Sequence, residues 1–167
     1  MKNHIIDKDE EERRLKALAE YRILGTEPES CYDDITQIAA RTCHVPISLM
    51  TLVDKDRQWF KSKVGFQTSE TRRDWSFCTH AIKENNPLIV HDAYQDERFI
   101  NNPLVTGEPK IRFYAGFPLK NNEGNKLGTL CVIDRKPGSL DEEQCSIMEL
   151  LAKQIVSFLE LRKRSLN

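Results

Sequence analysis

Two side chains with catalytic chemistry lie close together in the segment Ser76-Phe-Cys-Thr-His80. A thiol near an imidazole can form a nucleophile and base pair, because the imidazole accepts the thiol proton. If the segment is helical, however, Cys78 and His80 are two positions apart and point about 200° away from each other. We therefore predict that Cys78 is not catalytic. The simpler interpretation is that Cys78 packs in the core and that His80 makes a structural hydrogen bond.

The other thiols show no pattern of paired cysteines. The chain has five cysteines, an odd number, without the spacing of a zinc site. We expect reduced thiols and no disulfide that the fold requires. Cys78 and Cys131 could nevertheless be neighbours, one on a covering helix and one on a central strand, and could then form a redox pair.

Aromatic side chains at several points of the chain could form the apolar walls of a small-molecule site. They are Trp59, Phe60, Trp75, Phe113 and Tyr114. The polar groups that could contact a ligand at the rim are Arg73, His80, Asp92 and Arg112. Gly116 interrupts a strand, where glycine often marks a close approach to the backbone. We predict a cavity in front of Gly116; the alternative is that the aromatic side chains simply fill the core.

A hairpin of two strands, 113–119 and 127–134, organises the predicted fold. Both arms are rich in β-branched and aromatic residues, and the Asn and Gly residues between them suit a turn. Further strands are predicted at 47–53, 58–64 and 88–91, and helices at 9–24, 26–45, 77–84 and 139–164. We expect a capping box from Ser139 to Glu142. The segments 65–74 and 101–109 are expected to be irregular.

These elements predict an α+β fold with an antiparallel sheet of five or six strands. The terminal helices would cover one face, and short helices and loops the other. A chain of 167 residues is about one domain. We expect residues 1–8 to be a disordered tail, residues 9–164 to form the domain and residues 165–167 to be a short C-terminal tail.

Composition excludes several classes of partner. The net charge is −1, whereas binding to nucleic acid or to an anionic membrane favours a basic excess. No apolar run has the length of a membrane span, and the polar N-terminus does not resemble a signal peptide. We therefore expect a cytoplasmic protein that binds neither nucleic acid nor membrane.

Several blocks of the chain, in order, resemble a GAF domain of the bacterial sensor type that accompanies histidine kinases and diguanylate cyclases. They are PISLMTLVDKDRQWFKSKVG, RRDWSFCTHAI, PLIVHDAYQDERFINNPLVTG, and RFYAGFPL with GNKLGTLCVID. The resemblance covers roughly Glu12 to Arg162. It implies a PAS-like sheet whose ligand lies on the loop-covered face, where the block SFCTHAI lines the pocket. Cys43-His44 lies too early in the chain to match the Cys-His pair of bilin-binding members.

The resemblance implies a non-enzymatic sensory domain that binds a small molecule or partner, of unknown identity, and signals through its terminal helices. The alternatives are a thiol-dependent free methionine sulfoxide reductase, using Cys78 with Cys131, and a ligand-free dimerisation module. Because no kinase or cyclase output domain is visible, the chain is either cut from a larger protein or a stand-alone regulator. The apolar residues from Ile147 to Leu161 exceed one helix face, so we expect a homodimer through the first and last helices.

Overall fold

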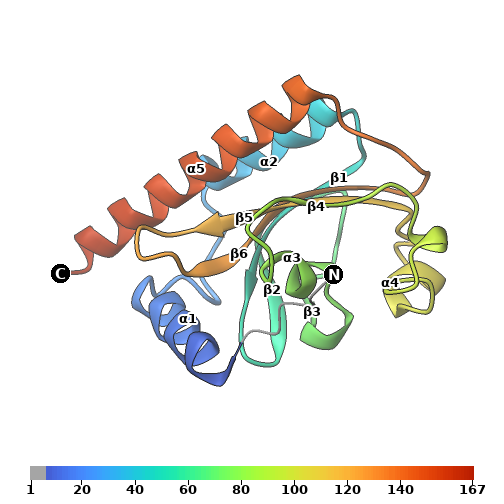
Figure 1. The fold of residues 1–167 in the computed structure, drawn as a ribbon. Coiled ribbons are helices and arrows are strands. Elements are labelled where there is room, and N and C mark those ends of the chain that lie inside the picture. The colour runs from blue at the N-terminus through green and yellow to red at the C-terminus, as the bar shows by residue number, and fades with distance from the viewer. Residues whose placement is uncertain (1–6) are drawn as a thin grey trace.

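The computed structural model describes residues 7–167 (Figure 1). Its helices are α1 (Lys8–Glu20), α2 (Ser30–Cys43), α3 (Phe77–Ala81), α4 (Pro103–Thr106) and α5 (Glu142–Ser165), with 3-10 turns η1 (Arg73–Trp75) and η2 (Ala93–Gln95). Its strands are β1 (Ile47–Val53), β2 (Arg57–Val64), β3 (Glu70–Arg72), β4 (Leu88–Val90), β5 (Phe113–Lys120) and β6 (Lys126–Asp134). The predicted α+β class is confirmed.

The six strands form one sheet in the order β3-β2-β1-β6-β5-β4. Every neighbouring pair is antiparallel. The predicted hairpin is the β5–β6 pair, and β6 lies at the centre between β1 and β5. Strand β6 is therefore hydrogen-bonded on both edges, and because both faces of the sheet are also covered, its residues Leu127–Ile133 are all buried.

Each face of the sheet carries its own apolar core. On one face α1, α2 and α5 pack through side chains such as Leu18, Ile35 and Ile155, and we call this the helix-side core. On the other face α3 and α4 pack over β1, β5 and β6, and we call this the cover-side core. Figure 1 shows α2 and α5 together above the sheet, with α3 and α4 below it. The predicted division of the helices between the two faces is confirmed.

The ends of the long helices differ from the prediction. Helix α1 begins after Asp7, whose carboxylate accepts the Glu10 backbone N–H, and it ends at Glu20 instead of Leu24. The chain leaves the helix because Tyr21 and Ile23 turn into the helix-side core, where both are fully buried. Most of the predicted tail, residues 1–8, lies outside the described residues.

The predicted cap of the last helix was also misplaced by two residues. Asp141, and not Ser139, caps α5: its side chain accepts the Gln144 N–H, and the Gln144 side chain accepts the Asp141 N–H. Asp and Ser are about equally good caps, so the sequence offers two overlapping capping boxes.

Two segments expected to be irregular contain short elements. In 65–74, strand β3 pairs with β2 although its side chains are polar and show no apolar alternation. In 101–109, Asn102 caps the single turn α4 and Pro103 occupies its first position. Among residues 7–167, no helix has both the length and the apolar character needed to span a membrane.

Gly116 does not face an open site, which corrects the prediction of a cavity in front of it. A Cβ atom added there would lie 2.7 Å from Cζ of the Tyr114 ring and still closer to its hydroxyl group. The ring therefore lies back over its own strand, in the space that the missing side chain leaves. Gly116 allows this position because it has no Cβ atom.

We predict that Gly116→Ala lowers the free energy of unfolding by about 1–3 kcal/mol, the usual cost of overpacking, because the new methyl group displaces the Tyr114 ring. Chemical denaturation measures this change. In a Tyr114→Phe background the same substitution should cost less, since the nearest atom, the hydroxyl oxygen, is gone. Equal stability of Gly116→Ala and the wild type would contradict this account of the ring.

Candidate functional site

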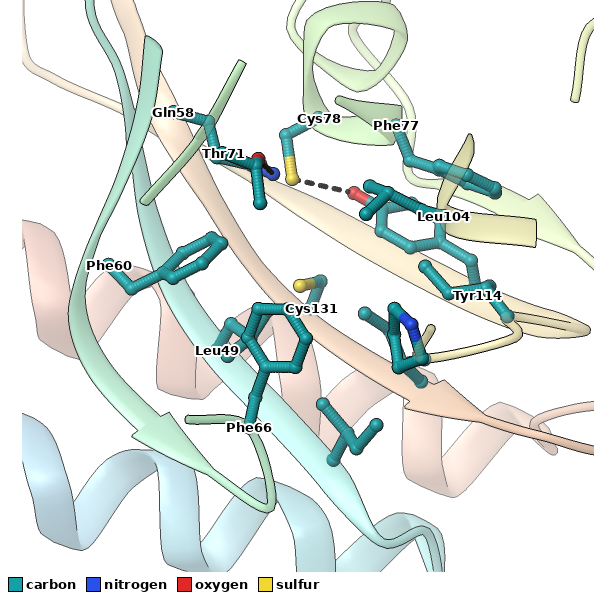
Figure 2. A pocket seen from close by; sticks show the side chains of 14 residues that line it. Leu49, Gln58, Phe60, Phe66, Thr71, Phe77, Cys78, Leu104, Tyr114 and Cys131 are labelled. Atoms are coloured by element: carbon teal, nitrogen blue, oxygen red, sulfur yellow. Dashed lines mark hydrogen bonds between the residues drawn. The ribbon is translucent and has the colours of Figure 1, made fainter. Parts of the chain in front are cut away.

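A small cavity lies in the cover-side core between the sheet and the segment that carries α3 and α4 (Figure 2). The space open to the centre of a water molecule is about 20 Å³. Its walls are mostly apolar and include Leu49, Phe60, Phe66, Phe77, Leu104, Tyr114 and Ile133, with both Cys78 and Cys131 exposed to the interior. The cavity is thus far smaller than the roughly 300 Å³ of a typical small-molecule site.

Helix α3 places Cys78 over the sheet. Ser76 caps this helix by accepting the Thr79 N–H at 3.3 Å, and the Ser76 hydroxyl donates to Gln58 Oε1 on β2 at 2.8 Å. Both side chains are buried, so these bonds hold the start of α3 against the sheet. One turn of helix is enough to aim the Cys78 side chain at β5 and β6.

The Cys78 sulfur is hydrogen-bonded to two hydroxyl groups in this position. Tyr114 Oη on β5 is 3.1 Å away and Thr129 Oγ1 on β6 is 3.0 Å away. Thr129 is in turn bonded to Thr51 Oγ1 on β1 at 3.0 Å. All four side chains are buried, so the short helix and three strands share one polar network in an apolar core. We call these four residues the Cys78 cluster.

The surroundings of the two cysteines separate their acidities. Burial alone raises the pKa of the Cys78 thiol, but hydrogen bonding by Cys131, Thr129, Thr51 and Tyr114 outweighs it and lowers this pKa below its usual value. Burial raises the pKa of Cys131, and the adjacent Cys78 raises it further. Cys78 is therefore the group of the pair that ionises more readily.

The structure brings only part of the predicted site together. Cys78 and Tyr114 line the cavity, and Gly116 makes room for the Tyr114 ring. Trp59 lies on the opposite face of the sheet, in the helix-side core, so it does not form a wall. Trp75 packs at the edge of the cover-side core, where its carbonyl accepts the Asn102 side-chain N–H at 2.9 Å.

The predicted polar residues are spread around the cover. The His80 ring meets Phe99 edge-on with centroids 5.0 Å apart, and burial lowers its pKa. Asp92 and Arg112 form a bidentate ion pair, with bonds of 2.8 and 2.9 Å, and Arg112 lies over the exposed ring of Tyr94. His80, Asp92 and Arg112 are not among the residues that line the cavity.

Arg73 lies outside the cavity and connects the cover to α1. Its guanidinium group donates to Glu11 Oε1 at 2.5 Å and to the Asp54 carbonyl at 3.1 Å. Its own carbonyl accepts the hydroxyl of Thr79, the residue after Cys78, at 3.0 Å. Burial opposes ionisation of Glu11, but Arg14 and Arg73 outweigh it and lower the pKa of Glu11 to about 2. We call the contact the Arg73–Glu11 bridge.

Of the hydroxyl groups around Cys78, sequence reasoning named Tyr114 as a site residue but missed Thr129 and Thr51. Thr129 is two positions before Cys131, so the alternation of β6 places both on the cover side and could have identified it. Thr51 is the residue that pairs with Thr129 across β1 and β6. By contrast, no spacing connects Gln58 or Phe66 with Cys78, because only the folded sheet brings them near.

Comparison with known proteins agrees with this fold. A family model described as GAF domain matches residues 27–158. A cyclic di-GMP phosphodiesterase of Pseudomonas aeruginosa is 38% identical over 150 residues, which are 89% of this chain but 26% of the relative. The chain thus spans about a quarter of that protein.

Two solved structures share the fold at low identity. The GAF domain of an Acinetobacter phosphoenolpyruvate-protein phosphotransferase is 16% identical with a TM-score of 0.64, covering 92% of this chain and 95% of that one. Free methionine-R-sulfoxide reductase from Neisseria meningitidis, in complex with its substrate, is 15% identical with a TM-score of 0.65, covering 98% and 99%.

These similarities overturn one prediction. The expectation that the chain is not an enzyme is contradicted, because the 38% identical relative is named as an enzyme and a structure of the same fold is a reductase. The predicted family is confirmed: the GAF model covers most of the chain, and solved GAF domains share its fold. The chain belongs to the GAF domain family.

Proposed function

We propose that this chain is a sensory GAF domain that regulates a signalling enzyme, with its input at the Cys78 cluster and its output through α1 and α5. The family membership supports the regulatory role. The similarity to a cyclic di-GMP phosphodiesterase favours second-messenger turnover as the regulated reaction. This role suits a cytoplasmic protein, and a kinase or cyclase is the other output that we consider.

The observation that carries this proposal is the connection from the cavity wall to α1. Cys78 lies on α3, the next residue, Thr79, is bonded to the Arg73 carbonyl, and Arg73 pairs with Glu11 on α1. Arg14, one turn further on α1, pairs with Glu11 and reaches the Lys126 carbonyl of β6 at 3.4 Å. A movement of α3 therefore acts on the first turns of α1 through two ion pairs.

We predict that the coupling between Cys78 and α1 depends on Arg73. Cys78→Ala removes the sulfur that holds α3, so hydrogen exchange of the amides in the first turns of α1 should speed up severalfold. In an Arg73→Gln background the same substitution should leave α1 exchange almost unchanged, because the bridge is already broken. Hydrogen-exchange mass spectrometry on the four proteins measures this non-additivity.

A matched control for this prediction is Arg72→Gln. Arg72 is the neighbouring arginine, but it pairs with exposed Asp74 and not with α1. Its substitution should leave the response to Cys78→Ala intact. If Cys78→Ala speeds hydrogen exchange in α1 equally with and without Arg73, the Arg73–Glu11 bridge does not carry the signal. Within a longer protein that contains this domain, Cys78→Ala and Arg73→Gln should each change the rate of cyclic di-GMP hydrolysis.

Thiol chemistry at the same cavity is a second candidate function. The observation that favours it is the convergence of two cysteines of unequal acidity on one small cavity. A reductase that uses Cys78 with Cys131 would fit this arrangement. It is compatible with the regulatory proposal, since oxidation of the pair would move α3.

We further propose that the domain forms a homodimer through its last helix. Leu150 and Leu161 on α5 are 61% and 58% exposed, and together with Gln154 and Ser157 they follow the 4-3-4 spacing of a coiled-coil seam. Ile38 on the adjacent helix α2 is also exposed. Within residues 7–167, α1 contributes no large exposed apolar side chain. We therefore favour an interface formed by α5 and α2 over the predicted interface of the first and last helices.

We expect Leu161→Glu to weaken the dimer by at least tenfold, which corresponds to about 1.4 kcal/mol, because it places a charge from each chain on the seam between the paired helices. Sedimentation velocity across a concentration series measures the dissociation constant. Ile100→Glu, at another exposed apolar side chain far from α5 in the chain, is the control and should leave the constant unchanged. A wild-type monomer at high micromolar concentration would contradict the proposal.

A further inference from the structure

Two thiols, those of Cys78 and Cys131, line the cavity of the cover-side core. Figure 2 shows the sulfur atoms of Cys78 and Cys131 directed into the same space, one from α3 above and one from β6 below. Apolar side chains could fill both positions, yet the protein keeps a hydroxyl on each side of Cys78, from Tyr114 and Thr129. Such hydrogen bonds stabilise a sulfur that carries negative charge.

The size of the cavity restricts what can reach these thiols. The space open to a water centre is about 20 Å³, and a single water needs roughly 10–15 Å³ by the same measure. The cavity therefore admits a molecule of one or two heavy atoms. Hydrogen peroxide has two oxygen atoms, is uncharged, and can use the hydrogen-bonding groups of Cys78 and Gln58 at the wall.

A surface hollow adjoins the cavity and offers a route from solvent if a wall side chain moves. This hollow of about 530 Å³, beside β3 and η1, is lined by Phe66, Thr71 and Leu104, and these three residues also line the inner cavity. The two spaces therefore adjoin at these three side chains. The Phe66 ring meets Phe60 edge-on at 5.5 Å and is partly buried, so its rotation would open the passage.

We propose that Cys78 is a peroxide-reactive thiol and that Cys131 is its resolving partner. The Cys78 thiolate attacks one oxygen of hydrogen peroxide, the O–O bond breaks, and the departing hydroxide takes up a proton to become water. Cys131 then attacks the sulfenic sulfur of Cys78; the S–S bond forms, the S–O bond breaks, and the released hydroxide leaves as water with the Cys131 proton. Two thiols are oxidised to a disulfide, and one peroxide is reduced to two waters.

This inference rests on the proposed regulatory function and names its chemical input. A bond to Cys131 draws Cys78 away from the Tyr114 and Thr129 hydroxyl groups and shifts α3 towards β6. Thr79 moves with α3, and its bond to the Arg73 carbonyl passes this movement to the Arg73–Glu11 bridge. The oxidised and reduced forms therefore differ in how α1 is held.

The test is to treat the fully reduced protein with a small excess of hydrogen peroxide at neutral pH. Alkylation, proteolysis and mass spectrometry then identify which thiols have reacted. We expect the Cys78–Cys131 peptide pair to appear before oxidation of Cys31 or Cys145, although these two thiols are the more exposed ones. Cys131→Ser should accumulate a sulfenic acid at Cys78 that dimedone labels, and Cys78→Ser should form no cross-linked peptide.

Matched variants separate chemistry from folding. Cys43→Ser replaces a buried thiol of the helix-side core, whose pKa burial raises to about 11, and should leave the rate unchanged. Phe66→Ala should speed the reaction severalfold by opening the passage. Tyr114→Phe should slow it at a pH below the Cys78 pKa, by about tenfold for each unit by which that pKa rises.

Three results would overturn the proposal. The first is an inert Cys78 while Cys31 and Cys145 oxidise. The second is an unchanged rate in Phe66→Ala together with an unchanged rate in Tyr114→Phe at a pH below the Cys78 pKa. The third is a Cys78–Cys131 disulfide that forms faster with free methionine sulfoxide than with peroxide at the same concentration, which would identify a reductase. The hydrogen-exchange experiment with Cys78→Ala and Arg73→Gln needs no oxidant. The regulatory proposal can therefore hold even if the peroxide proposal fails.

Discussion

The hydrogen bonding of one buried sulfur atom determines much of the cover-side architecture. Polar atoms removed from water are almost always hydrogen-bonded, and Cys78 meets this requirement with hydroxyl groups from two different strands. For the Tyr114 hydroxyl to reach the sulfur, the ring must lie along its own strand, which in turn requires glycine at position 116. The position of a five-residue helix thus depends on the absence of a single Cβ atom.

This constraint also explains why the cavity is small. The Tyr114 ring occupies the volume in front of Gly116 that a ligand would otherwise fill, and Phe77 stacks on Phe99 at 4.0 Å to close the next space. A larger ligand would fit here only if these side chains withdrew. Here aromatic rings fill the cover side, and what remains is a space whose chemistry is set by two thiols. One fold can therefore serve different chemistries through a few interior side chains.

The sequence predicted the fold well because its main information is periodic. Strand β1 has the predicted bounds, and the β5–β6 hairpin is the predicted one with slightly longer strands, since alternation and turn residues act locally. The same reasoning failed where burial depends on distant contacts. Leu159 is fully buried whereas Leu161 is 58% exposed, although both belong to the same apolar run of α5. Only the packing of α5 against β5 and α2 distinguishes them.

The site was harder to predict, because a composition that suits a binding pocket does not reveal which face a side chain occupies. Trp59 and Phe60 are adjacent on β2, yet Trp59 packs in the helix-side core and Phe60 lines the cavity. The expected aromatic pocket therefore combined side chains that lie on opposite faces of the sheet. Cys78 and Cys131 line the same cavity, as expected from the element and the face of the sheet to which each could be assigned. Thr129 was missed even though the same parity argument includes it.

The two ends of α1 are held in different ways, and this difference makes the helix suitable as an output element. Its C-terminal end is fixed by Tyr21, which is fully buried and bonded through its hydroxyl to Glu160 on α5. Its N-terminal half depends on Glu11 and Arg14, charged groups whose partners lie on η1 and β6. Apolar burial is lost only when the core opens, whereas an ion pair at the edge of the core breaks with a small displacement of one partner. A shift of η1 can therefore release the start of α1 while its end stays attached to α5, so the signal would be a change in one helix and not the unfolding of the domain.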